Sequence, residues 1–111
     1  MEPGVRANSA AKAVEMVPGV VRRSIAWGER AHVVELHLKK GSNVPLHSHH
    51  HEQCGYLVSG RFAFTIGGKT EEVGPGGGWF IPGGVEHGVD VLEDSVAIDV
   101  FSPVREEYLD R

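Results

Sequence analysis

Short apolar runs with strand-like alternation recur along the chain, and turn-forming residues separate them. Phe62, Phe64 and Ile66 fall on one face of an extended strand, because side chains two positions apart point the same way. Gly67-Gly68 follows directly and predicts a two-residue hairpin, since glycine adopts positive φ without strain. Further turn signals stand at 59–60 and 93–94. The predicted strands cover residues 20–27, 31–39, 55–58, 61–66, 71–73, 79–81, 88–91 and 95–101.

Glycine crowding and chain length narrow the fold class. Eleven of the 15 glycines lie between Gly55 and Gly88. This density excludes a long-helix protein, because each interior glycine costs a helix about 1 kcal/mol. Many short strands within 111 residues predict an all-β fold, either a small closed barrel or two packed sheets. We expect a single domain over residues 17–111, preceded by an N-terminal lead-in over residues 1–16.

Charge and cysteine content exclude several classes of partner. Eleven Lys and Arg against 15 Asp and Glu give a net charge of −4, and no basic run occurs. The chain therefore lacks the electrostatic signature of proteins that bind nucleic acid or anionic membranes. No apolar stretch resembles a signal peptide or a membrane span. The single Cys54 cannot form an intrachain disulfide, so we expect a cytoplasmic protein.

Four histidines within five positions are the most distinctive feature of the sequence. On an extended strand, one face would carry His47, His49, His51 and Gln53. His50 and its neighbour Glu52 would then face solvent. Imidazoles two positions apart and a nearby amide oxygen can converge on one small cation. A histidine-rich stretch is also typical of a solvated loop or an adventitious metal binder, so this segment alone leaves both interpretations open.

Another histidine, His87, follows a Gly/Pro turn that could bring it beside the cluster. Three neutral imidazoles and an amide oxygen would form a divalent-metal site with open coordination positions. His32 and His37 are isolated on predicted strands, and we expect packing or surface roles for them. Cys54 has the opposite parity to Gln53, so we expect a packed small side chain rather than a ligand or nucleophile.

The spacing around these histidines resembles that of the cupin superfamily. The first cupin motif reads G-x5-H-x-H-x3-4-E-x6-G, matched by Gly41, His47, His49, Gln53 and Gly60. The second motif reads G-x5-P-x-G-x2-H-x3-N, matched by Gly76, Pro82, Gly84 and His87. The resemblance implies a single-domain cupin, a small jelly-roll β-barrel with a metal ion in its mouth. The metal ligands that it implies are His47, His49, Gln53 and His87.

Two positions depart from the cupin motifs. Gln53 stands where the family usually has Glu, and Val91 stands where it usually has Asn. The neutral amide leaves the site one positive charge richer than a site with three histidines and a glutamate, which suits an anionic substrate. The position of Val91 is structural rather than catalytic. The implied cofactor is one divalent transition metal, and this ligand set suits Ni, Fe, Mn, Co or Zn.

The last predicted strand carries an acidic residue between apolar neighbours. Its alternation places Ala97, Asp99 and Phe101 on one face and Val96, Ile98 and Val100 on the other. Because both faces are largely apolar, we expect Asp99 in a dry environment, where an ionised carboxylate is costly unless a cation lies nearby. A metal ion or Arg105 would supply that cation. Alternatively, Asp99 caps a strand end or forms a structural pair with Arg105.

The segment D-V-F-S-P-V-R-E, from Asp99 to Glu106, resembles the pectin-degradation cupins when taken with both motifs. Members of that family convert 4,5-unsaturated monouronates, released from pectin or alginate, into linear keto-uronates. The resemblance implies a small anionic sugar substrate surrounded by Asp99, Phe101 and Arg105 as catalytic residues. Small cupins also commonly pair through their sheets, so we expect a homodimer.

Two other functions remain open from the sequence. One is a non-enzymatic cupin that binds a small ligand such as a sugar acid. The other is a different metal-dependent cupin enzyme, such as a small dioxygenase or an isomerase. The combination of Asp99 and Arg105 favours the uronate reaction over both.

Overall fold

A computed structural model describes residues 1–110, and its regular structure is almost entirely β-strand. The strands are β1 (Val14–Val17), β2 (Val20–Trp27), β3 (His32–Leu38), β4 (Asn43–His47), β5 (Glu52–Ile66), β6 (Lys69–Val73), β7 (Gly78–Ile81) and β8 (His87–Ser102). Two short 3-10 turns, η1 (Asn8–Ala10) and η2 (Glu106–Tyr108), lie near the chain ends. The all-β prediction is confirmed.

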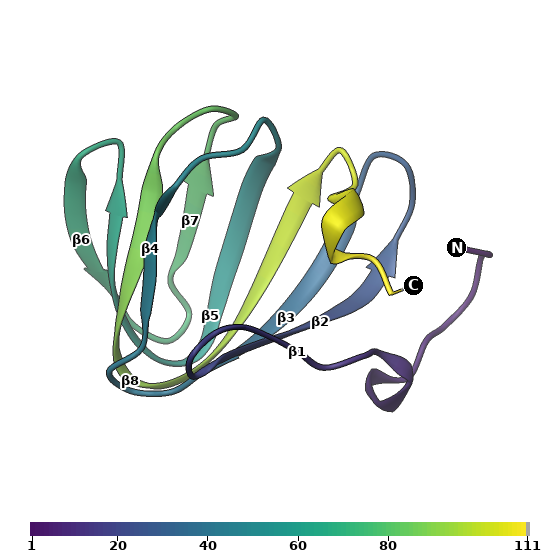
Figure 1. Ribbon diagram of the computed structural model, residues 1–111, viewed down its shortest axis with the longest axis horizontal. Helices are drawn as coiled ribbons and strands as arrows, with labels where there is room; N and C mark the ends of the chain where they lie inside the picture. The colour runs from purple at the N-terminus through teal and green to yellow at the C-terminus, as the bar shows by residue number, and fades with distance from the viewer. Residues whose placement is uncertain (111) are drawn as a thin grey trace.

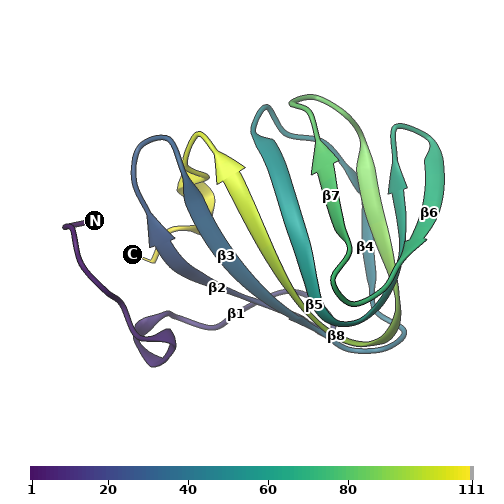
Figure 2. The same cartoon turned by 180° about the vertical axis from the view of Figure 1, so that it is seen from behind.

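Two long strands, β5 and β8, pair with each other and curve through the whole barrel (Figures 1 and 2). The N-terminal part of β5 pairs with β7 and with the C-terminal part of β8, which also pairs with β3. The C-terminal part of β5 pairs with β6 and with the N-terminal part of β8, which also pairs with β4. Strands β2 and β1 extend the first of these layers. The result is a sheet folded over on itself, as a jelly roll requires.

The predicted turns at 59–60 and 93–94 are wrong, because both segments lie inside continuous strands. The pairing of β5 with β8 shifts register three times between Leu57 and Phe62. Such bulges bend a strand without ending its hydrogen-bonded ladder. The turn-forming residues therefore mark the place where one strand passes from one layer to the other. By contrast, the hairpin at Gly67-Gly68 is confirmed, with Ile66 paired to Lys69 and positive φ at both glycines.

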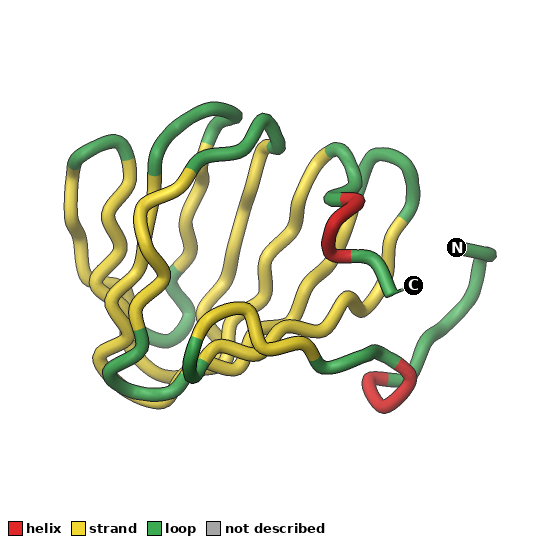
Figure 3. The backbone as a smooth tube through the Cα atoms, in the orientation of Figure 1, coloured by secondary structure: helices red, strands yellow, loops and turns green. Residues whose placement is uncertain are grey.

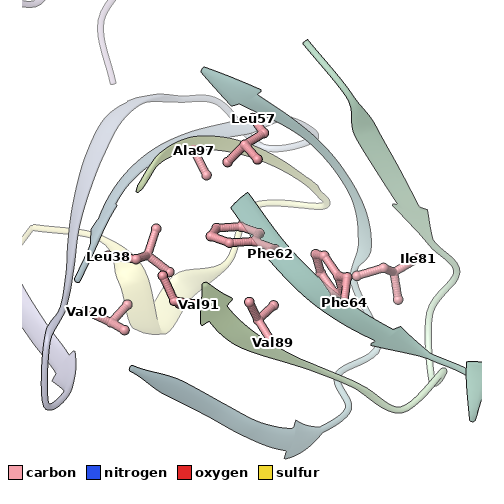
Figure 4. Close-up of a cluster of buried hydrophobic side chains, with 9 residues drawn as sticks. All are labelled: Val20, Leu38, Leu57, Phe62, Phe64, Ile81, Val89, Val91 and Ala97. Carbon is pink, nitrogen blue, oxygen red and sulfur yellow. The ribbon is translucent and has the colours of Figure 1, made fainter. Parts of the chain in front are cut away.

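The barrel interior is filled by buried hydrophobic side chains, nine of which are drawn in Figure 4. They are Val20, Leu38, Leu57, Phe62, Phe64, Ile81, Val89, Val91 and Ala97. Burial of each larger member stabilises the fold by about 1.5–3 kcal/mol. Phe62 and Phe64 both point into this core, as the alternation in the sequence predicts.

Gly60 lies in the bend of β5, and Gly68, in the hairpin, has a similar φ and provides a control for the packing at the bend. Gly60 and Gly68 have φ of +96° and +83°. A Cβ at Gly60 would lie 1.9 Å from Ser95 Oγ and 2.6 Å from the Asp94 carbonyl oxygen, whereas nothing lies within 4 Å at Gly68. We expect Gly68→Ala to lower the free energy of unfolding by about 1–2 kcal/mol, from backbone strain alone. Gly60→Ala should cost about 1–3 kcal/mol more through overpacking. Urea unfolding of both variants measures this, and equal losses would contradict it.

The loops that approach the functional site gather at one end of the barrel (Figures 1 and 3). They are the segments 28–31, 48–51 and 82–86, and the C-terminal turn η2 lies beside them.

At the N-terminus, β1 begins at Val14, within the predicted lead-in, and pairs with β2. Arg6 forms an ion pair of 2.5 Å with Asp110, which joins the two chain ends. Within residues 1–110, no helix is long and apolar enough to cross a membrane.

Candidate functional site

Three histidines meet at the open end of the barrel. His47 ends β4 and is the register partner of His87, which begins β8. His49 lies in the loop that follows β4. The potential ligand atoms of the three imidazoles lie within 4.8 Å of one another. The structure therefore brings together three of the four ligands that the sequence predicts, and these three residues can hold a metal ion.

Backbone carbonyl groups set the orientation of all three rings. The Nδ1 atoms of His47, His49 and His87 lie 2.8, 3.1 and 2.8 Å from the carbonyl oxygens of residues 45, 51 and 85. Each Nδ1–H donates to its carbonyl, which leaves Nε2 deprotonated, as a metal-binding histidine requires. The Nε2 atom of His87 is buried and has no hydrogen-bond partner among the described residues. Burial is also the main cause that lowers the pKa of His49, to about 4, and the pKa of His87.

The side chain of Gln53, from the start of β5, completes this arrangement. Its Oε1 lies 3.1 Å from His49 Nε2, and its amide group donates a hydrogen bond to Asp99. With His49 protonated at Nδ1, the two facing atoms are both acceptors, and a cation between them would relieve their repulsion. The donor set of three imidazoles and one amide oxygen fits a divalent transition metal.

The two neighbouring histidines, His50 and His51, lie in a loop and not on the strand that the sequence predicted. β4 ends at His47, so residues 48–51 form a loop in which the two-residue period does not apply. His51 is buried, and its ring lies 5.4 Å from the His49 ring and 6.4 Å from the Phe101 ring. It is not one of the three histidines that converge. His50 is exposed, as predicted.

Asp99 lies on β8 with its side chain inside the barrel and is 5% exposed. Trp79 Nε1 donates a hydrogen bond of 2.8 Å to its Oδ1. Burial raises the pKa of Asp99 to about 6, although the hydrogen bonds from Gln53 and Trp79 and the charge of Arg105 oppose this rise. A carboxyl group with a pKa near neutrality can both accept and release a proton. The ion pair of Arg105 is with Glu107 and not with Asp99, so the alternative of a structural pair between them is not what the structure shows.

Trp79 and Gly55 are part of the site, and the sequence did not indicate this role. Gly55 is the register partner of both Trp79 on β7 and Asp99 on β8. A Cβ at Gly55 would lie 2.0 Å from the Trp79 indole, so the ring passes over this glycine to reach the carboxylate. Only a glycine leaves room for that path. Gly55 is not a position of either cupin motif, and a sequence does not show which residues of two other strands a glycine will lie between.

Aromatic rings hold Arg105 at the mouth of the cavity. Its guanidinium carbon lies 3.9 Å from the Tyr108 ring centre and 5.0 Å from the Phe101 ring centre. Nε donates a hydrogen bond of 2.8 Å to Glu107. The Phe101 ring also meets the His49 ring edge to face, at 5.7 Å. Tyr108 is the member of this group that sequence reasoning missed.

One cavity connects these groups. Its polar wall consists of His47, Gln53, His87, Asp99 and Arg105. The rest of its lining is mostly apolar and includes Val34, Leu36, Phe62, Phe64, Trp79, Phe101 and Tyr108. All the predicted site residues except His49 line this cavity, and His49 contacts one of them, Gln53. Such a cavity, apolar with a few convergent polar groups, is typical of small-molecule sites.

The lowered histidine pKa values predict acid sensitivity of the metal-free protein. Burial lowers the pKa of His32 and of His49 to about 4, whereas an unfolded chain has histidine pKa values of about 6.5. Between these values the unfolded chain binds more protons, so stability falls as the pH falls below about 6.5. We expect the urea midpoint, measured with chelator, to decrease steadily from about pH 7 to about pH 4.5. A constant midpoint over this range would contradict the neutral buried histidines.

The prediction that Cys54 is a packed small side chain is wrong. Cys54 is exposed on the outer face of β5, not packed in the core. Alternation along β5 correctly placed Cys54 and Gln53 on opposite faces, but the face that carries Cys54 is exposed at this position. His37 is a surface residue that pairs with Glu35 at 2.9 Å, and His32 is fully buried, in line with the roles expected for them.

Comparisons with known proteins identify the family and the fold of this chain. The Cupin domain family matches residues 34–101. The pectin degradation protein KdgF of Dickeya dadantii (strain 3937) is 34% identical over 97 residues, which cover 86% of this chain and 88% of that protein. The structure of KdgF from Halomonas sp. matches with a TM-score of 0.90 at 30% identity, over 97% of this chain and 100% of that one. An RmlC-like cupin from Shewanella frigidimarina NCIMB 400 matches with a TM-score of 0.91 at 25% identity, over 97% of both chains.

Proposed function

Since the chain belongs to the cupin family, we propose that it is a metal-dependent enzyme that converts 4,5-unsaturated monouronates into linear keto-uronates. The relative named as a pectin degradation protein, KdgF, supports this substrate class, and the solved KdgF structure has the same fold. The observation that carries the proposal is the placement of Asp99. It is a buried carboxyl group that lines the same cavity as His47, His87 and the cationic Arg105, and these two histidines belong to the cluster of three that can hold a metal ion.

The reaction is an isomerisation, so it needs proton transfer and no other reactant. The substrate ring is a hemiacetal joined to an enol ether. Removal of the proton from the anomeric hydroxyl breaks the bond between C1 and the ring oxygen, which forms an aldehyde at C1 and an enolate at C5. Delivery of a proton to C4 converts the enolate into a ketone. A single carboxyl group that accepts the first proton and donates the second completes the balance.

The residues of this chain have separate tasks in that scheme. Asp99, held by Trp79 and Gln53, moves the proton, because its pKa of about 6 suits both directions of transfer. Arg105 binds the substrate carboxylate through its two Nη groups, a geometry that suits a planar anion. The ring of Phe101, between Arg105 and His49, limits where the sugar can lie.

The ligands of the proposed metal are His47, His49, Gln53 and His87. When bound, a divalent metal supplies Lewis acidity that stabilises negative charge on substrate oxygens. The neutral amide of Gln53 in place of a carboxylate preserves more of the positive charge for an anionic ligand. The choice among Ni, Fe, Mn, Co and Zn depends on metal supply as well as on this donor set.

The test is the loss of alkene absorbance when purified protein is mixed with 4,5-unsaturated galacturonate. We expect catalysed loss that stops with chelator and returns when a divalent transition metal is added. A protein that binds the sugar tightly without changing it would instead be a ligand-binding cupin. Saturated galacturonate serves as the matched control for binding without reaction.

We also propose a homodimer in the cytoplasm. The outer face that β5 shares with β7 and β8 exposes Tyr56, Val58, Phe80 and Val100. Apolar clusters of this kind mark interaction surfaces on soluble proteins. Phe80→Asp should shift the sedimentation coefficient from dimer to monomer, whereas Leu46→Asp, at an exposed apolar residue on β4, should leave it unchanged. A wild-type monomer would contradict this pairing.

The lone Cys54 is consistent with the reducing environment of the cytoplasm.

A further inference from the structure

A polar pair is buried where β2 meets β3, beside the mouth of the barrel. Ser24 and His32 are both 0% exposed. Ser24 Oγ lies 2.9 Å from His32 Nε2. The ring of His32 is enclosed between Trp27 and Phe101, with both ring centres at 6.2 Å. A buried polar group destabilises the fold unless its donors and acceptors form hydrogen bonds. The hydrogen-bond partners of Ser24 and His32 therefore indicate the role of the pair.

The hydrogen bonds run in one direction through the pair. The backbone N–H of Arg105 donates to His32 Nδ1 at 3.2 Å, so the ring proton is on Nε2. Nε2–H then donates to Ser24 Oγ, and the hydroxyl of Ser24 donates to the carbonyl oxygen of Tyr108. Burial lowers the pKa of His32 to about 4, which keeps the ring neutral and Nδ1 able to accept.

Both ends of the C-terminal turn are therefore attached to the β2–β3 hairpin. The attachment points are the N–H of Arg105, just before η2, and the carbonyl of Tyr108, at its end. A further hydrogen bond of 3.1 Å reaches that carbonyl from Arg22 Nη1. The side chains of Arg105 and Tyr108, which stack on each other, both line the cavity.

We propose that Ser24 and His32 are positioning residues that hold Arg105 where it binds the substrate carboxylate. This inference rests on the proposed function, because it assigns the pair a role in binding the anion. His32 is not among the residues that line the cavity, and its hydrogen bond to the Arg105 backbone is its most direct link to the anion-binding side chain. Without the pair, the turn that carries Arg105 loses the two bonds that attach it to Ser24 and His32, and the guanidinium is no longer held ready for a planar anion.

Two substitutions at one position separate this role from simple core packing. His32→Asn keeps an acceptor near Nδ1 and loses the bond to Ser24, whereas His32→Leu removes both bonds and keeps an apolar side chain of similar size. We expect His32→Leu to raise KM for 4,5-unsaturated galacturonate about tenfold, with kcat changed less than about twofold, because a uniform loss of binding raises KM alone. His32→Asn should restore KM to within about threefold of wild type.

Hydrogen exchange provides a readout that does not depend on turnover. The Arg105 amide should be protected in wild type and in His32→Asn, and unprotected in His32→Leu. If His32→Leu does not fold, Ser24→Ala, which removes one hydroxyl, should show the same direction of change in KM. Normal KM in both His32→Leu and Ser24→Ala would overturn the inference, as would equal KM values for the Leu and Asn variants.

Failure of the proposed function is a separate outcome. If wild type does not transform the substrate, the same variants are compared by their Kd for saturated galacturonate, measured with metal-loaded protein. Weaker binding by His32→Leu, restored by His32→Asn, would support the positioning role without the reaction. Equal binding by all variants, or no binding by wild type, would overturn it.

Discussion

Asp99→Asn is expected to reduce kcat by about 100- to 10,000-fold, the range that loss of a general acid–base group produces. The substitution keeps the size of the side chain and its acceptor for Trp79 Nε1, but it removes the group that exchanges a proton. The ligands His47, His49 and His87 are unchanged, so metal content should equal that of wild type. Steady-state kinetics and metal analysis of the same preparation measure both effects.

A matched control for this variant lies on the same strand. Asp90 is exposed on β8 and accepts a hydrogen bond of 2.8 Å from Asn43, which an amide oxygen can also accept. Asp90→Asn should therefore have wild-type kcat. Near-normal turnover by Asp99→Asn with full metal content would show that another group moves the proton.

His49→Ala is expected to abolish both metal binding and turnover. His49 is one of three converging imidazoles, and its Nε2 lies 3.1 Å from Gln53 Oε1. Changes to groups that only support a metal ligand cost about 10- to 100-fold in affinity, so loss of a ligand should weaken binding by at least about 100-fold. Elemental analysis after dialysis and a chelator competition assay measure the loss.

The neighbouring histidine provides the control. His50 is exposed and stacks on His51 at 3.9 Å, outside the group of converging ligand atoms. His50→Ala should retain the metal and its activity. Equal metal loss in both variants would indicate that the histidine-rich loop binds metal nonspecifically.

The three converging histidines were predicted through the resemblance of their spacing to the cupin motifs and not through strand alternation, because His49 lies in a loop. His47 and His87, 40 positions apart in the chain, become register partners because β4 pairs with β8. Alternation along one strand predicted that Asp99 and Phe101 share a face, and the structure shows that this face is buried. Alternation of side chains is a local property of one strand, so it can be predicted without knowing which strands pair.

Features that depend on packing between strands far apart in the chain could not be predicted from the sequence. Trp79 reaches Asp99 only because Gly55, on the strand between them, has no Cβ. The turns predicted at 59–60 and 93–94 became bends in long strands, since the ladder between β5 and β8 outweighs local turn preference. Tyr108 lies after the last strand, where no periodicity indicates a role.

Product analysis in D2O tests the central claim most directly. Wild-type protein with metal is mixed with 4,5-unsaturated galacturonate, and early product is examined by NMR and mass spectrometry. We predict an open-chain keto-uronate that is an isomer of the substrate and carries solvent deuterium at C4, formed by wild type and not by Asp99→Asn. Unchanged substrate, or a product that has gained oxygen, would contradict a proton-relaying isomerase.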